Sequence, residues 1–136
     1  MNIDQWLTRY GQAWRDKDAY AAAGLFTEDG VYLSSPTAPA HVGSDAIAAY
    51  WRRATATQQE VDLRFGRPVI NGRRVAVEWW AVMRDADWQP DATGDRVTLP
   101  GCLILRFTED GLCEELREYY NPVFGEALQP PTGWGR

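Results

Sequence analysis

One stretch of the sequence decides the fold class: residues 73–83 read RRVAVEWWAVM. Side chains alternate between the two faces of a β-strand, so this stretch can be divided into two sets. One set is wholly apolar: Val75, Val77, Trp79, Ala81 and Met83. The other set is mixed: Ala76, Glu78, Trp80 and Val82. The pattern predicts a long strand with one face toward a core and the other toward solvent or a second subunit.

The segments around this strand repeat its period of two. They predict strands over 60–65, 96–107 and 112–121, with a short β-prone segment at 31–33. Asn71-Gly72 is a two-residue hairpin signal, and residues 109–111 form a turn. Residues 85–95 form a polar loop with four aspartates, which lacks the glycine and glutamate of an EF-hand. We interpret that loop as solvated and the strands as an antiparallel meander.

The residues before this sheet have helical spacing. The pattern predicts a helix over 3–17 with Asn2 as its cap and Gln5 completing a capping box, and a short helix over 19–26. A turn over 27–30 follows, and Ser44 caps a third helix. Three helices followed by a sheet indicate the α+β class, with the helices on one face. We expect a single domain over 1–136, with a core of about 3–121 and a Pro/Gly-rich tail over 122–136.

Composition excludes several classes of function. The net charge of -5 and the pI of about 4.8 disfavour nucleic-acid binding, which needs a basic face. With one histidine and no Cys-x-x-Cys, we expect no metal site; with no phosphate-loop motif, we expect no nucleotide cofactor. No apolar run is long enough to span a membrane, and the N-terminus lacks the features of a signal peptide. We therefore expect a cytoplasmic protein in which Cys102 and Cys113 are reduced thiols.

One carboxylate stands out because of its position in the last strand. Glu118 shares its face with Leu116 and Tyr120, and Cys113 and Tyr119 lie on the other face. Burial among apolar residues would raise the pKa of the Glu118 carboxyl, which suits a general acid or base. A buried structural carboxylate bonded to a tyrosine or tryptophan is the alternative. On the outer face we expect Glu78 to pair with Arg106 or Arg117.

Several motifs resemble one known family. They are Arg9-Tyr10, Ala13-Trp14, Asp18-Ala19-Tyr20, Leu25-Phe26-Thr27-Glu28-Asp29-Gly30, His41-Val42-Gly43-Ser44-Asp45-Ala46-Ile47, Val77-Glu78-Trp79-Trp80, Leu105-Arg106-Phe107, Asp110-Gly111 and Leu116-Arg117-Glu118-Tyr119-Tyr120. Over about residues 3–121, the chain resembles the SnoaL-like branch of the nuclear transport factor 2-like superfamily. The resemblance implies a cone-shaped, curved sheet wrapped around three helices and enclosing a pocket. It also implies a homodimer through the outer sheet face, here the face of Trp80 and Tyr119.

The resemblance also allows each catalytic set of the superfamily to be compared with this sequence. Tyr10 matches the tyrosine of the steroid isomerases, whereas their two acidic positions fall at Ser35 and near Leu103. In the epoxide hydrolases, the arginine and one aspartate align with Trp79 and Ala81. Polyketide cyclases use one acidic residue, a role that Glu118 is able to fill.

These observations lead to alternative hypotheses about function. The first is a cofactor-independent cyclase, isomerase or dehydratase-like enzyme for a small apolar, oxygenated molecule, with Glu118 transferring a proton and Tyr10 binding an oxyanion. The second is a non-catalytic ligand-binding or dimerisation module, and a third is an epoxide hydrolase-like enzyme. The expected substrate-binding residues are Trp14, Trp51, Trp79, Leu103, Tyr120, Ser35 and His41.

Overall fold

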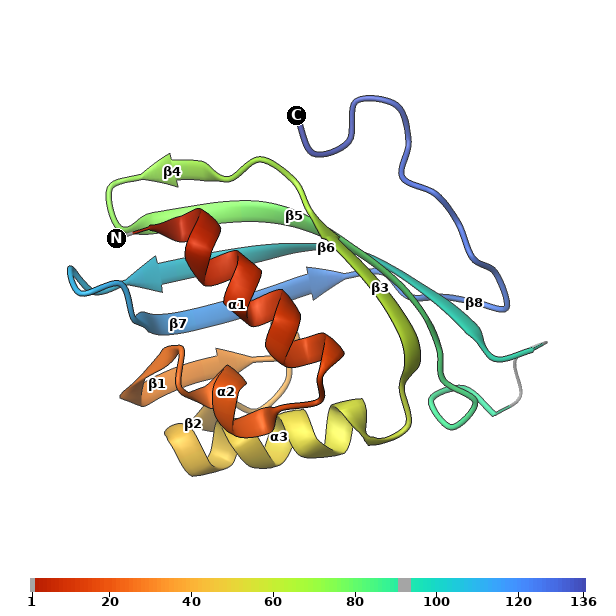
Figure 1. Ribbon diagram of the computed structural model, residues 1–136, viewed down its shortest axis with the longest axis horizontal. Coiled ribbons are helices and arrows are strands. Elements are labelled where there is room, and N and C mark those ends of the chain that lie inside the picture. The colour runs from red at the N-terminus through yellow and green to blue at the C-terminus, as the bar shows by residue number, and fades with distance from the viewer. Residues whose placement is uncertain (1, 91–93) are drawn as a thin grey trace.

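The computed structural model describes residues 2–90 and 94–136, which form three helices and one curved sheet (Figure 1). The helices are α1 (Ile3–Arg15), α2 (Ala19–Ala23) and α3 (Ser44–Ala56). The strands are β1 (Phe26–Leu33), β2 (His41–Val42), β3 (Gln59–Phe65), β4 (Val69–Asn71), β5 (Arg74–Arg84), β6 (Arg96–Phe107), β7 (Cys113–Tyr120) and β8 (Val123–Phe124). Helix α1 lies across the concave face of the sheet, α3 packs on β1 and β2, and α2 packs on α1 and α3. The predicted α+β class with a curved sheet around N-terminal helices is confirmed.

The strand order is β2-β1-β7-β6-β5-β3, with β4 paired to β5 and β8 paired to β6. All of these pairs are antiparallel except β1 with β7, which is parallel. The meander from β5 to β7 therefore follows the prediction, whereas β1 joins it from a distant part of the chain. A parallel neighbour needs no hairpin, so no local turn signal in the sequence announces this pair.

Some predicted boundaries are wrong. Helix α2 ends at Ala23, and the predicted turn over 27–30 belongs to β1, whose register shifts between Phe26 and Val31. The cap of α3 is Gly43 and not Ser44, because the chain enters the helix with a positive φ of 90° that glycine adopts readily. The cap of α1 is as predicted, since the Asn2 side chain accepts a hydrogen bond from the Gln5 N–H at 3.0 Å.

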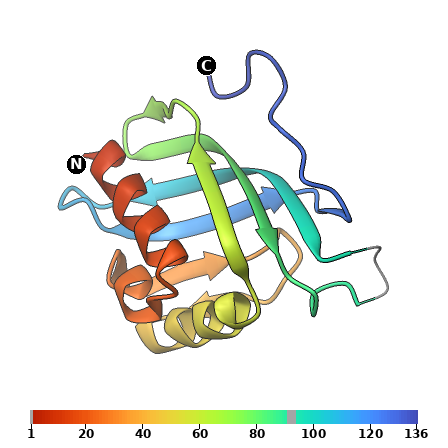
Figure 2. The ribbon, with the colours of Figure 1, turned by 45° about the vertical axis from the view of Figure 1, so that its right-hand side comes forward.

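The concave face of β5 is apolar throughout, as predicted: all five side chains from Val75 to Met83 on that face are buried. On the outer face, however, Trp80 and Val82 are also buried. The C-terminal tail covers this face (Figure 2), and the Trp80 indole donates to the Leu128 carbonyl at 2.9 Å. The interpretation of Trp80 as an apolar patch for a second subunit is therefore wrong, and dimerisation stays a prediction.

The ends of the tail segment are bound to the sheet by hydrogen bonds. Thr98 Oγ1 donates to the Glu126 carbonyl at 2.7 Å and accepts from the Leu128 N–H at 3.0 Å. Near the C-terminus, the Gly135 carbonyl accepts from the Arg67 N–H at 2.7 Å. Polar anchors at both ends and the buried Trp80 between them make the tail part of the folded structure.

Two predicted placements on the outer face are corrected. Glu78 does not pair with Arg106 or Arg117, because the register sets it opposite Cys102, and its carboxylate accepts from the Gly135 N–H at 3.1 Å. Arg106 instead contacts the carboxylates of Glu114 and Glu115 at 2.9 and 3.2 Å. An irregularity after Arg106 changes the alternation at the start of β7, so Cys113 points into the core and not outward.

Both cysteines are free thiols, with Cys113 buried and Cys102 partly buried. No helix among the described residues is long and apolar enough to cross a membrane.

Candidate functional site

A cavity of about 380 Å³ lies between the helices and the concave face of the sheet. Its lining combines aromatic rings with polar groups: Trp14, Tyr32, Ser34, Tyr50, Trp51, Arg53, Ala54, Thr57, Gln58, Trp79, Asp85, Asp87, Trp88, Leu99, Glu118 and Tyr120. The helices contribute Trp14 and Trp51, and the strands contribute Trp79, Glu118 and Tyr120. A volume of this size accommodates a small-molecule ligand, and the aromatic walls would exclude water from it.

The Glu118 carboxyl lies in the cavity wall and is buried, with 5% of the residue exposed. Strand β7 sets it opposite Leu103 of β6, on the concave face. Its Oε1 accepts the Tyr32 hydroxyl at 2.6 Å and the Tyr10 hydroxyl at 3.3 Å. Its Oε2 accepts no hydrogen bond from any residue that the structure describes. The two tyrosine hydroxyls therefore hold one carboxyl oxygen, and the other oxygen is available to contact a ligand.

Burial raises the pKa of the Glu118 carboxyl to about 7. The hydrogen bonds from Tyr32 and Tyr10 lower this pKa, so desolvation is the dominant effect. Burial and the nearby carboxylate also raise the pKa of both tyrosines well above the usual value, so both stay protonated donors. A carboxyl with a pKa near neutrality is able to take up and release a proton under ordinary conditions.

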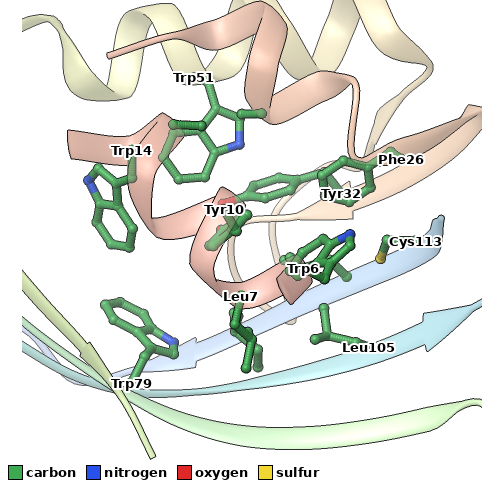
Figure 3. Packing of buried hydrophobic residues seen from close by; sticks show 14 of the residues in the cluster. Trp6, Leu7, Tyr10, Trp14, Phe26, Tyr32, Trp51, Trp79, Leu105 and Cys113 are labelled. Atoms are coloured by element: carbon green, nitrogen blue, oxygen red, sulfur yellow. The ribbon is translucent and has the colours of Figure 1, made fainter. Parts of the chain in front are cut away.

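An aromatic cluster supports the site. Tyr10 stacks on Trp6 with ring centroids 5.0 Å apart and meets the edge of Trp51 at 5.4 Å. Trp14 lies between Trp51 and Trp79, with ring centroids 5.4 and 5.5 Å away (Figure 3). The Trp14 indole donates to Gln58 Oε1 at 2.7 Å. Rings that pack in this way leave little freedom for the walls of the cavity to collapse.

The structure brings together five of the residues selected from sequence. Glu118, Trp14, Trp51, Trp79 and Tyr120 all line the cavity. A sixth, Tyr10, contacts the Glu118 carboxyl but is not among the lining residues, so its hydroxyl meets the carboxyl and not the cavity.

The other three selected residues lie away from the cavity wall. Leu103 is packed in the core. Ser35 lies in the loop after β1, where its hydroxyl accepts the Ala38 N–H at 3.1 Å. His41 in β2 packs on Tyr50, with ring centroids 4.7 Å apart, and lines an adjoining surface hollow. Burial and the nearby Arg53 charge lower the pKa of His41.

Sequence reasoning missed two important residues. Tyr32 makes the shorter hydrogen bond to Glu118. The β-prone segment over 31–33 indicated a strand at Tyr32, but nothing in it indicated a contact with Glu118, which lies 86 residues away. Trp88 lines the cavity and packs on Tyr120 and Phe124, with ring centroids 6.2 and 5.6 Å apart. In sequence it appeared only as a loop residue, and nothing local indicated its partners.

The aspartate-rich loop is only partly as interpreted. Asp85 is buried and not solvated, because its Oδ1 accepts the N–H groups of Asp87 and Trp88, both at 3.2 Å. Asp91, another of the four aspartates of this loop, lies outside the described residues. Within residues 2–90 and 94–136, no three His, Cys, Asp or Glu side chains gather as metal ligands.

Comparison with solved structures shows the same fold in several proteins. An epoxide hydrolase/cyclase-like enzyme, SalBIII, described in pyran ring formation in the polyether salinomycin, is 19% identical with a TM-score of 0.72, over 87% of this chain and 89% of that one. A protein with a ketosteroid isomerase-like fold from Catenulispora acidiphila, in complex with trimethylamine, is 21% identical with a TM-score of 0.72, over 85% of this chain and 84% of that one. A candidate polyketide cyclase from Xanthomonas campestris is 24% identical with a TM-score of 0.72, over 87% and 89%. At these identities, the likeness establishes the fold alone.

Comparison with curated proteins gives no match. The family model of the SnoaL-like domain, in contrast, matches residues 7–116, a span that begins in α1 and ends in β7. The chain therefore belongs to the SnoaL-like family, within the nuclear transport factor 2-like superfamily.

Proposed function

We propose that this protein is a cofactor-independent enzyme that transfers a proton at a carbon atom of a small, apolar, oxygenated molecule. One observation carries the proposal: the buried Glu118 carboxyl, in the wall of a ligand-sized cavity, has one oxygen held by two tyrosines and the other without a partner among the residues that the structure describes. Its pKa of about 7 suits both removal and return of a proton.

In the proposed reaction, ionised Glu118 takes a proton from a carbon next to a carbonyl group. The C–H electron pair passes into the carbonyl as an enolate, and the proton moves to Oε2. In an isomerisation, Glu118 returns that proton to the far carbon of a C=C bond conjugated with the enolate. In a cyclisation, the enolate carbon attacks a second carbonyl carbon, the π bond of that carbonyl opens to an alkoxide, and the alkoxide takes the proton back from Glu118. Tyr32 and Tyr10 are positioning residues in this scheme, because they hold the carboxyl through Oε1.

The family and two of the structural neighbours support this reaction class. The SalBIII protein is described as epoxide hydrolase/cyclase-like, and the Xanthomonas protein as a candidate polyketide cyclase. A non-catalytic module is the alternative, and it would be favoured if tryptophan rings filled the interior of the cone. The interior instead contains a cavity of about 380 Å³ whose lining includes Glu118, which favours the enzyme. An epoxide hydrolase-like reaction finds less support, because Trp79 and Ala81 stand where the resemblance implies an arginine and an aspartate.

The test is hydrogen–deuterium exchange at the carbons beside the carbonyl of 2-tetralone, followed by proton NMR in D2O. This bicyclic ketone is a neutral, apolar probe with an acidic C–H bond. We expect the wild-type protein to accelerate exchange, and Glu118→Gln to reduce the accelerated rate by about 100-fold or more. Glu109→Gln, at an exposed carboxylate in the turn before β7, is the matched control and should leave the rate unchanged.

The pH profile of the same exchange tests the positioning residues. The rate should rise with pH through a midpoint of about 7, as Glu118 ionises. Tyr32→Phe removes the shorter hydrogen bond to the carboxylate, so it should move the midpoint upward, and Tyr10→Phe should move it upward by less. Exchange that is equally fast in a folded Glu118→Gln variant would remove Glu118 from the mechanism.

A further inference from the structure

The proposed reaction places negative charge on the carbonyl oxygen of the substrate, and a hydrogen-bond donor is needed to stabilise that charge. From sequence we expect Tyr10 to supply it, but the Tyr10 hydroxyl contacts the Glu118 carboxyl and Tyr10 is not among the lining residues. Tyr32 lines the cavity, yet its hydroxyl donates to the same carboxyl at 2.6 Å. The donor for the substrate oxygen therefore has to come from another residue of the lining.

Gln58 is a buried carboxamide in this lining, with 6% of the residue exposed. Its backbone N–H donates to the Thr55 carbonyl at 3.1 Å, in the turn between α3 and β3. Five other lining residues have hydroxyl or guanidinium donors, and all are exposed or partly exposed: Ser34, Tyr50, Arg53, Thr57 and Tyr120. Solvent is able to satisfy exposed donors, whereas a buried amide depends on a partner in the protein or on a ligand.

One hydrogen bond fixes the orientation of the Gln58 carboxamide. The Trp14 indole donates to it at 2.7 Å, and an indole nitrogen is a donor only, so the atom that it contacts is the amide oxygen Oε1. Trp14 is held in turn between the rings of Trp51 and Trp79 (Figure 3). The amide nitrogen Nε2 is therefore directed away from Trp14, and it cannot change places with the oxygen without breaking this bond.

The Gln58 nitrogen is both unpaired and accessible. No residue that the structure describes accepts a hydrogen bond from Nε2. Among the described residues, four unpaired side-chain atoms are shielded by the protein, and Gln58 Nε2 is not one of them: Thr27 Oγ1, Trp51 Nε1, Trp79 Nε1 and Arg117 Nε. Because Gln58 lines the cavity and is otherwise buried, the cavity is where an acceptor atom is able to reach this nitrogen.

We propose that the Gln58 carboxamide donates to the carbonyl oxygen of the substrate and stabilises the enolate that forms when Glu118 takes the proton. A donor whose orientation is already fixed stabilises a developing oxyanion without having to reorganise during the reaction. The substrate is then a carbonyl compound whose acidic C–H bond meets Glu118 while its oxygen meets Gln58. This inference rests on the proposed function, because it assigns a second catalytic residue to the same cavity.

The first test is the exchange of 2-tetralone in D2O at a pH above the midpoint of the profile, where Glu118 is ionised. Gln58→Met keeps the length of the side chain and removes both N–H donors, so it should lower the accelerated rate by about 100-fold. The midpoint of the profile should stay in place, because the Gln58 donors act on the substrate and not on Glu118. Gln59→Met, the same change at the exposed first residue of β3, is the matched control and should leave the rate unchanged. An unchanged rate in a folded Gln58→Met variant would overturn the inference.

A second variant separates this role from the support that Gln58 gives to Trp14. Gln58→Glu keeps an oxygen that accepts the Trp14 indole N–H and replaces the amide nitrogen by a second oxygen. It should lower the rate at least as much as Gln58→Met, because a carboxylate does not donate and repels the enolate. A wild-type rate in Gln58→Glu would mean that Gln58 only positions Trp14, and it would overturn the inference.

Binding without catalysis gives an independent measurement. We compare 2-tetralone with 1,2,3,4-tetrahydronaphthalene, a hydrocarbon of similar shape without the oxygen. Each is titrated into ¹⁵N-labelled wild-type protein, and the side-chain N–H signals of Gln58 are followed by NMR and assigned with Gln58→Met. We expect the ketone to move these signals downfield and to bind about three- to tenfold more tightly than the hydrocarbon, as one added hydrogen bond implies. Equal affinity for the two probes, or no response of the Gln58 signals to the ketone, would overturn the inference.

The two measurements distinguish a failure of this inference from a failure of the proposed function. The NMR comparison uses the wild-type protein, so it stands even where a Gln58 variant fails to fold. A Gln58 response in a wild-type protein that does not accelerate exchange would contradict the enzyme proposal and keep Gln58 as the residue that binds a ligand oxygen. Exchange that depends on Glu118 but not on Gln58 would support the enzyme and contradict the role of Gln58.

Discussion

Replacing Glu118 by glutamine should remove a large pH dependence from the stability of this protein. Glutamine keeps an oxygen that accepts the hydroxyls of Tyr32 and Tyr10, and it carries no charge at any pH. In the folded protein, burial raises the pKa of the Glu118 carboxyl from 4.5 to about 7. The unfolded chain, in contrast, exposes this carboxyl to water, where its pKa is that of an ordinary glutamate.

The sign of the effect follows from the proton count. Between pH 4.5 and 7, the folded protein keeps the Glu118 proton and the unfolded chain releases it, so stability falls as pH rises. The contribution is complete below the unfolded pKa and is lost as pH rises through the folded pKa. At about 1.4 kcal/mol per pKa unit, the shift corresponds to about 3 kcal/mol across this interval.

The assay is urea unfolding of the wild-type and Glu118→Gln proteins at several pH values from 4.5 to 8. We expect the free energy of unfolding of the variant, minus that of the wild type, to increase by about 3 kcal/mol over this range. Glu109→Gln, at an exposed turn residue, controls for the loss of one negative charge. A difference that stays constant with pH, or that changes in the opposite direction, would refute the reasoning.

Two further predictions concern packing. Gly101→Ala should lower the free energy of unfolding by about 1–3 kcal/mol, because the added Cβ atom would displace the Trp79 ring. Thermal unfolding measures this loss. Gly24→Ala is the control and should have a smaller effect, because its added Cβ atom meets nothing closer than 3.3 Å. Removing residues 122–136 should expose Trp80, which should lower the melting temperature and increase self-association measured by light scattering. A truncated protein with an unchanged melting temperature and an unchanged mass in light scattering would contradict the covering role of the tail.

The parts of the fold that the sequence predicted are those with a local cause. The alternation over 73–83 identified the buried face of β5 correctly, including Trp79, because side-chain direction in a strand depends only on position along it. The prediction failed for Cys113, since an irregular pairing at the start of β7 interrupts the alternation. It also failed for Trp80, because the cover comes from a distant segment with no pattern of its own.

The candidate site shows the same limit. Glu118 was identified from its face of the last strand, and its burial confirms that placement. Tyr10, 108 residues away in sequence, was selected through the family resemblance, whereas Tyr32, 86 residues away, was not identified. Tyr32 reaches the carboxyl through the parallel pairing of β1 with β7, a long-range contact that no motif in the sequence records.

The one-sided hydrogen bonding of the Glu118 carboxyl has a stereochemical consequence. Both hydroxyls meet the same oxygen, so the carboxyl group cannot exchange its two oxygens by rotation without breaking both bonds. A flat ring held against the tryptophan walls would then present only one of its faces to the other oxygen. In the proposed reaction, the proton would be delivered from a single side, and a new stereocentre in the product would form with one handedness.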